Sequence, residues 1–208
     1  MVQIKTIVFD LGGVYFTDGT KLAFVKMRDI FGITDMRSLM MLFSNSPKTL
    51  GRDIRLGLIT MDDFEREFAK EIKISSEKIQ LIRHLWFSCY AMNYKMEDII
   101  KQLKDKFRLV IFSGNIRERI EYLDKRYHFL QYFHDTVFSF DYQLNKEDVE
   151  FYDELLKHLD CEPHEALIID DEKINIEKAE SIGLNTILYY YTEQLVDELN
   201  KFDIHVNL

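Results

Sequence analysis

The sequence predicts an α/β protein in which a doubly wound parallel sheet carries an inserted α-helical cap. Four short apolar runs each end abruptly in polar or glycine residues, which is typical of buried parallel strands. From about residue 94 onward, helical and strand patterns alternate, as a parallel sheet requires. Between about residues 17 and 93 the patterns are helical only, so an insertion follows the first strand. The expected strands lie at residues 4–9, 109–112, 167–169 and 186–188.

Apolar residues that recur at every third or fourth position mark the expected helices. Thr60 and Asp63 have the spacing of a capping box, which begins a helix. Gly183 lies at the position of a helix C-terminal cap. We therefore expect a core of residues 1–16 and 94–208 and a cap of residues 17–93. The expected helices lie at about residues 22–31, 36–43, 62–72, 77–90, 96–103, 116–123, 151–159 and 176–182.

Composition narrows the possible functions. The chain has 208 residues, of which 47% are hydrophobic, enough for a substantial core. Its formal charge of −9 argues against a broad nucleic-acid or anionic-membrane surface, but not against a small phosphorylated ligand beside a local cation. No apolar stretch reaches the roughly 20 residues of a membrane span, and the early Asp10 is unlike a signal peptide. Cys89 and Cys161 lie far apart in the sequence, without the spacing of a metal site, and are expected to be reduced thiols. We therefore expect a soluble cytoplasmic protein, of undetermined oligomeric state.

Polar residues follow three of the predicted strands. Asp10 follows the first, Ser113 the second, and Asp170 and Asp171 the third. Each residue alone has an ordinary explanation as a turn former or a helix cap. The carboxyl ends of parallel strands meet at one edge of a sheet, however, so these groups should lie together, with Lys146 from a nearby loop. Carboxylates, a hydroxyl and an ammonium group suit a phosphate ester and a divalent cation.

Four sequence motifs resemble those of the haloacid dehalogenase-like hydrolase superfamily. They are Asp10-Leu11-Gly12-Gly13-Val14, then Ser113, then Lys146 with Phe151 and Tyr152 after it, and finally Asp170-Asp171-Glu172-Lys173-Ile174-Asn175. The helical insertion also resembles the small helical cap of that superfamily. The resemblance covers essentially the whole chain, and it implies a Rossmann-like core and a Mg²⁺-dependent phosphatase that acts on a small phosphorylated metabolite through an aspartyl-phosphate.

The resemblance also implies roles for eight residues. Some would react or hold the metal ion, some would bind the phosphoryl group, and two would order the last motif from behind. Asp10 would be the nucleophile and a metal ligand, joined by the Gly12 carbonyl oxygen and Asp171; Ser113, Gly114 and Lys146 would bind the phosphoryl group; Asp170 and Asn175 would order the loop.

The sequence departs from this family at one chemically important position. Family phosphatases usually carry a second Asp two residues after the nucleophile, as general acid and base, whereas this chain has Gly12. Loss of a general acid costs about two to four orders of magnitude, and least when the leaving group is already stable. We therefore expect a preference for acyl, aryl or anomeric sugar phosphates over alkyl phosphates. Asp18, near the start of the cap, could supply the proton or simply form a turn.

Smaller departures are Glu147, where family members often have Pro, and Gly114, where Asn is frequent. Within the cap, residues 50–57 place Arg52 and Arg55 between two glycines. This segment is either a site for anionic groups or a solvated connector between helices.

Three other functions stay open at this stage. A catalytically weak or inactive descendant could bind a phosphorylated ligand or a protein partner. A 2-haloacid dehalogenase would also use an Asp ester, but such relatives usually carry an aromatic residue at the position of Gly12 and need no metal. A phosphomutase would generally keep the second Asp.

Overall fold

The computed structural model describes residues 3–208, so Met1 and Val2 of the predicted core lie outside the described residues. Five strands form one parallel sheet in the order β3-β2-β1-β4-β5, which confirms the doubly wound α/β class. The strands are β1 (Thr6–Phe9), β2 (Arg108–Ser113), β3 (Asp135–Phe138), β4 (Ala166–Asp170) and β5 (Asn185–Leu188).

The first strand lies at the centre of the sheet. Phe9 is in register with Ile111 of β2 on one side and with Ile169 of β4 on the other. One residue further on, the Asp10 N–H donates to the Ile169 carbonyl oxygen over 3.0 Å. The residues that follow β1, β2 and β4 are therefore neighbours at one edge of the sheet.

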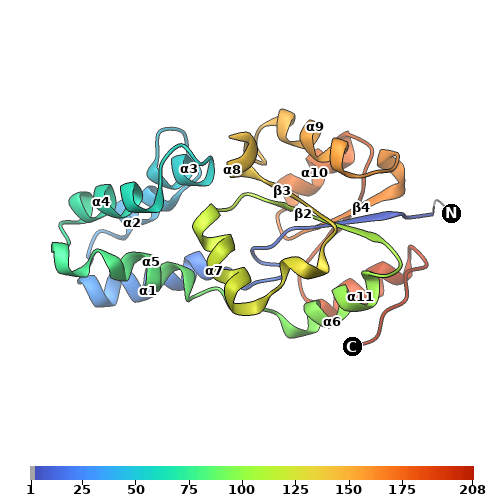
Figure 1. The fold of residues 1–208 in the computed structure, drawn as a ribbon, viewed down its shortest axis with the longest axis horizontal. Coiled ribbons are helices and arrows are strands. Elements are labelled where there is room, and N and C mark those ends of the chain that lie inside the picture. Colours follow the sequence, from blue (N-terminus) through green and yellow to red (C-terminus); the bar gives the residue numbers. More distant parts are fainter. Residues whose placement is uncertain (1–2) are drawn as a thin grey trace.

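Helices cover both faces of this sheet (Figure 1). Side chains of β1 alternate between the two faces, because Ile7 and Phe9 belong to one buried cluster and Val8 to the other. The helices α6 (Tyr94–Leu103), α7 (Arg117–Tyr127) and α11 (Thr192–Asn200) pack on the first face; α9 (Val149–His158) and α10 (Lys173–Ser181) pack on the second, and the short α8 (Ser139–Tyr142) follows β3.

The residues predicted as a cap contain five α-helices, which lie beside the core (Figure 1), and a short 3-10 helix at Ser76–Lys78. Their own core is aromatic: the Phe43 ring centroid lies 5.3 Å from that of Phe64 and 4.4 Å from that of Trp86. These helices are α1 (Gly19–Phe31), α2 (Met36–Phe43), α3 (Leu50–Arg55), α4 (Met61–Ile72) and α5 (Gln80–Phe87).

Two local signals in the sequence are confirmed. Thr60 and Asp63 form the predicted capping box at the start of α4, with the Thr60 hydroxyl accepting from the Asp63 N–H. Gly183 follows α10 at a φ of 89°, where a left-handed backbone favours glycine. No described helix is both long enough and apolar enough to cross a membrane.

Four elements differ from the predicted ranges, and two of them, α8 and α11, simply have no counterpart there. The connector that carries Arg52 and Arg55 is the helix α3, because Thr49 caps it and accepts from the Arg52 N–H. Gly51 lets α3 approach α2 closely, since a side chain there would overlap the Phe43 carbonyl group. The strand β3 has no counterpart among the predicted ranges, because only two of its four residues are buried.

The cap joins the core through two segments that run side by side. The Thr17 N–H donates to the Ala91 carbonyl oxygen over 2.9 Å, and the Asn93 N–H donates to the Tyr15 carbonyl oxygen over 2.9 Å. Because each connection is bonded to the other, they form one paired hinge beside the first strand.

Gly51→Ala should destabilise the cap by about 1–3 kcal/mol, because the new methyl group overlaps the backbone of α2. Urea unfolding followed by the fluorescence of Trp86, the single tryptophan of the chain, measures this directly in the cap. Gly114→Ala is the matched control: its methyl group would have no neighbour within 4 Å, so we expect a change below about 0.5 kcal/mol. Equal effects of the two substitutions would contradict the close approach of α3 to α2.

Candidate active site

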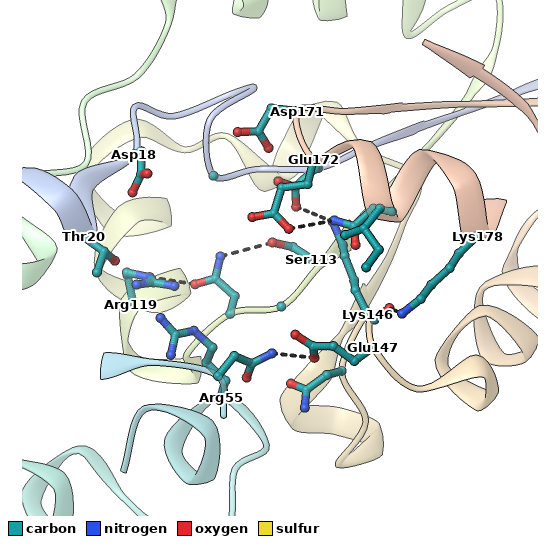
Figure 2. Close-up of a pocket in the computed structure, with 18 of the residues that line it drawn as sticks. Asp18, Thr20, Arg55, Ser113, Arg119, Lys146, Glu147, Asp171, Glu172 and Lys178 are labelled. Atoms are coloured by element: carbon teal, nitrogen blue, oxygen red, sulfur yellow. Dashed lines mark hydrogen bonds and ion pairs between the residues drawn. The ribbon is translucent and has the colours of Figure 1, made fainter. Parts of the chain in front are cut away.

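A cavity of about 340 Å³ lies at the carboxyl edge of the sheet and is lined by residues of both core and cap. It collects the predicted strand-end residues with side chains from α1, α3 and α7 (Figure 2). Of the eight predicted site residues, Asp170 alone does not line the cavity, because its side chain is fully buried. The other seven predicted residues line the cavity: Asp10, Gly12, Ser113, Gly114, Lys146, Asp171 and Asn175.

The Lys146 ammonium group bridges two carboxylates. Its Nζ lies 2.8 Å from Asp10 Oδ1 and 2.7 Å from Asp170 Oδ2. Burial alone would lower the pKa of Lys146, but the two carboxylates outweigh this effect and raise that pKa above its usual range. Lys146 is therefore a fixed positive charge beside Asp10.

Three carboxyl groups crowd the site. Asp10, Asp170 and Asp171 each offer an oxygen within 4.8 Å of the others. Burial raises the pKa of Asp10 to about 6, although Lys146 opposes this. Desolvation in the cavity raises the pKa of Asp171 to about 7, and repulsion from Asp10 and Asp170 adds to it. One ammonium group thus leaves the cluster short of positive charge, which a divalent cation would supply.

The protein already satisfies Asp170. Its Oδ1 accepts from the Glu172 N–H over 2.8 Å and from Asn175 Nδ2 over 3.0 Å, while its Oδ2 accepts from Lys146. Asp10 and Asp171 are the pair that face the cavity, and carboxylate oxygens are the ligands that Mg²⁺ prefers. The residues present therefore fit a Mg²⁺ ion held by Asp10 and Asp171, with Asp170 and Asn175 behind it.

The two neighbouring glycines have different surroundings. Gly13 has a φ of 83°, and a side chain there would overlap the Asp171 carboxylate, so glycine is required. Gly12 lines the cavity, lies outside the positive-φ region, and has no atom within 4 Å of the place where a Cβ would sit. The backbone and the space around the Cβ position therefore do not require glycine at Gly12, and the absence of an aspartate there is a chemical difference.

A hydrogen-bonded chain that the sequence did not indicate orients Ser113. Asn115 Oδ1 accepts from the Ile116 N–H over 2.9 Å and from Arg119 Nε over 2.7 Å. Its Nδ2 therefore lies toward Ser113 Oγ, at 3.3 Å. Because Ser113 accepts here, its own O–H can donate into the cavity. The signal for Arg119 is its spacing, since it follows Asn115 by four residues at the start of a helix.

The cap contributes one of its two candidate arginines. Arg55 lines the cavity, whereas Arg52 lies 3.7 Å from Asp148, outside it. Asn45 Nδ2 donates to Glu147 Oε2 over 2.6 Å, which ties the cap to the loop of Lys146. The acidic residue next to Lys146 thus makes a contact between cap and core.

The chain resembles known proteins in sequence and in fold. The sequence profile described as haloacid dehalogenase-like hydrolase matches residues 56–189. An uncharacterized protein of Dictyostelium discoideum is 29% identical, covering 78% of this chain and 70% of its own. The sesquiterpene phosphatase astK of Aspergillus oryzae is 22% identical, covering 86% and 87%. A haloacid dehalogenase family enzyme of Bacteroides thetaiotaomicron, solved with magnesium and inorganic phosphate, has a TM-score of 0.72 at 22% identity, covering 88% and 93%.

Mg²⁺ should bind more tightly as the pH rises. The folded-state pKa values of Asp10 and Asp171 lie above the ordinary value, so the unfolded chain loses these protons first and the metal-free fold loses stability between about pH 4 and pH 7. Mg²⁺ binds the ionised carboxylates and offsets that cost. We expect calorimetry to give an affinity at least about tenfold higher at about pH 8 than at about pH 5.5. Asp171→Asn should remove most of this dependence, and equal affinities at the two pH values would contradict the proposed ligands.

Proposed function

The chain belongs to the haloacid dehalogenase-like hydrolase family, and within it we propose a Mg²⁺-dependent phosphatase that acts on a small phosphorylated metabolite through an aspartyl-phosphate. The observation that carries the proposal is the bridge from Lys146 to Asp10 and Asp170, beside Asp171, in one cavity. The phosphatase name of the Aspergillus relative and the magnesium and phosphate complex of the Bacteroides enzyme support it.

Asp10 is the nucleophile in this proposal. One of its carboxylate oxygens forms a bond to phosphorus as the ester P–O bond breaks and the leaving oxygen takes the electron pair. Lys146 and Ser113 then donate to the phosphoryl oxygens, whose charge grows in the transition state. The oxygen of a water molecule next bonds to phosphorus as the bond from Asp10 to phosphorus breaks. This step restores the Asp10 carboxylate and releases inorganic phosphate, and the proton of the water passes to the phosphate or to solvent. The metal ion, held by Asp10 and Asp171, supplies further neutralisation of negative charge when bound.

The position that usually supplies the proton of the leaving group in this family is occupied here by a glycine. Gly12 has no side chain, and Asp18 accepts from the Lys21 N–H and lies 2.7 Å from Lys21 Nζ. The Asp18 carboxylate is therefore already engaged by Lys21. We propose that aryl, acyl or anomeric phosphates react faster than alkyl phosphates for this reason.

Gly12 also supports a second candidate, a catalytically weak protein that binds a phosphorylated ligand or a protein partner. Retention of Asp10, Lys146 and Asp171 in one cavity favours the enzyme, because a binding protein needs no nucleophile. We further propose a cytoplasmic location, which the unpaired thiols of Cys89 and Cys161 support.

Phosphate release from a panel of aryl, acyl, anomeric and alkyl phosphates tests the proposed function. We expect release that needs Mg²⁺, stops with a chelator, and falls by about 10³-fold or more in Asp10→Asn, because the nucleophile is lost. A thermal melt of Asp10→Asn shows that the variant is folded. Folded wild-type protein that releases phosphate from no member of the panel would overturn the enzyme in favour of the binding protein.

Gly12→Asp should restore a general acid. The new Cβ has no neighbour within 4 Å, so we expect turnover of alkyl phosphates to rise by about 10²- to 10⁴-fold, while aryl phosphates change little. Gly12→Asn is the matched control, since it has nearly the same shape but no proton to transfer. Equal gains with Asp and Asn, or equal gains for alkyl and aryl substrates, would contradict the role assigned to the missing acid.

A further inference from the structure

Two arginines from different parts of the chain line the same cavity, and we call them the arginine pair. Arg55 comes from α3 of the cap and Arg119 from α7 of the core. Arg119 is only 3% exposed, and Arg55 is partly buried. Figure 2 shows both on one side of the cavity and Lys146 on the other, with Ser113 between them.

The arginine pair has no direct counter-ion. Within residues 3–208, which the structure describes, neither guanidinium group has a carboxylate oxygen within 4.0 Å. Asp18 and Glu147 line the cavity too, but Asp18 pairs with Lys21 and Glu147 accepts from Asn45. These acids attract the pair only at longer range, without direct contact.

Aromatic rings, and not carboxylates, contact the two guanidinium groups. The Cζ atoms of Arg55 and Arg119 lie 5.9 Å and 5.4 Å from the centroid of the same Trp86 ring, and Arg119 lies 4.4 Å from that of Tyr90. Burial lowers the pKa of both arginines, and their mutual repulsion helps to lower the pKa of Arg55 to about 10. The desolvation cost of two neighbouring cations is thus only partly offset within the protein.

Each guanidinium group is fixed by some of its N–H groups and keeps others free. Arg55 Nη1 donates to the carbonyl oxygens of Phe43 and Gly51, at 2.8 Å and 2.7 Å. Arg119 donates from Nε to Asn115 and from Nη1 to the Tyr90 hydroxyl group. Among the described residues, neither Nη2 has an acceptor, yet no enclosed side-chain nitrogen lacks a partner. Each Nη2 group therefore keeps some exposed surface, on a residue that lines the cavity, and is free to meet an acceptor.

We infer that the arginine pair binds a second anionic group of the substrate, a carboxylate or a second phosphate. This inference rests on the proposed function, in which Asp10, Ser113 and Lys146 hold the phosphate that reacts. The substrate class is then a small phosphomonoester that carries another anion on its organic part. Guanidinium groups suit this task because their planar N–H edges match the oxygens of carboxylates and phosphates.

The position of the arginine pair indicates that its ligand is an anion on the organic part of the substrate and not the reacting phosphate. Asn115 stands between Arg119 and Ser113, joined to them by hydrogen bonds of 2.7 Å and 3.3 Å, so Arg119 acts one residue away from the phosphoryl group. Arg55 belongs to the cap, on the side of the cavity away from Lys146 (Figure 2). An anion bound by both arginines would also link cap and core.

Matched aryl phosphates test the inference. The meta and para isomers of carboxyphenyl phosphate are compared with the corresponding carbamoylphenyl phosphates, which have nearly the same shape but no second charge. We expect kcat/KM to favour at least one acid over its amide by about 10- to 100-fold. Phenylene bisphosphates, tested beside them, show whether the pair prefers a second phosphate to a carboxylate.

Arg55→Met should bring this acid-to-amide ratio close to one, because it removes the charge and the N–H groups, whereas Arg55→Lys should keep part of the preference. The ratio is the readout, because a cap that is merely weakened lowers kcat/KM for acid and amide alike. No preference in the wild type for either acid or for a bisphosphate, or a ratio that survives Arg55→Met, would overturn the inference.

Failure of the proposed phosphatase can be distinguished from failure of the second anion site. If no aryl phosphate is hydrolysed, the phosphatase proposal fails, but the pair is still tested by calorimetric binding of the same acids and amides to the folded protein. Tighter binding of an acid that is lost in Arg55→Met would support the second anion site, and equal binding of acid and amide would reject it. Hydrolysis without preference would reject the anion site alone.

Discussion

The rest of the site depends on the ion pairs that the Lys146 ammonium group forms with Asp10 and Asp170. Three carboxyl groups have oxygens within 4.8 Å of one another, an arrangement that mutual repulsion would otherwise oppose. The loop of Lys146 is itself held, since Lys178 Nζ donates to the Lys146 carbonyl oxygen over 2.6 Å and Asp148 accepts from the Asn145 N–H over 2.8 Å. The neighbouring positions of β1 and β4 bring the acids together, and Lys146 makes their closeness tolerable.

Parts of this arrangement are local in the sequence, and those parts were predictable. Asp10, Ser113 and Asp171 follow apolar runs, so the strand ends could be located without knowing the strand order. Arg119 could not be found this way, because its role depends on Tyr90 of the returning cap segment and on the Asn115 amide. The short strand β3 was missed as well. Only its last two residues, Val137 and Phe138, are buried, so its sequence lacks the apolar run by which the other strands were predicted.

The adjacent glycines show why a motif needs the structure for its interpretation. In the sequence, Gly12 and Gly13 both look like residues that let backbone approach a ligand. The structure separates them, because Gly13 is required by its φ of 83° and by the Asp171 carboxylate, whereas Gly12 faces open space. The fold therefore requires a glycine at Gly13. At Gly12 the fold makes no such demand, and the effect of the glycine is on the reaction. That difference makes the leaving group, rather than stability, the property on which Gly12 acts.

The cavity separates charge in a chain whose formal charge is −9. Its acidic end lies on strand ends of the core, where a metal ion can balance the carboxylates, and its basic end combines a core arginine with a cap arginine. The hydrogen bonds from Arg119 through Asn115 to Ser113 connect the two ends. An anion bound to Arg119 would thus also steady the Ser113 hydroxyl group, which in the proposed function meets the phosphate. Binding energy from the unreactive part of a substrate would then contribute to holding the reacting group in place, which is how remote contacts raise turnover as well as affinity.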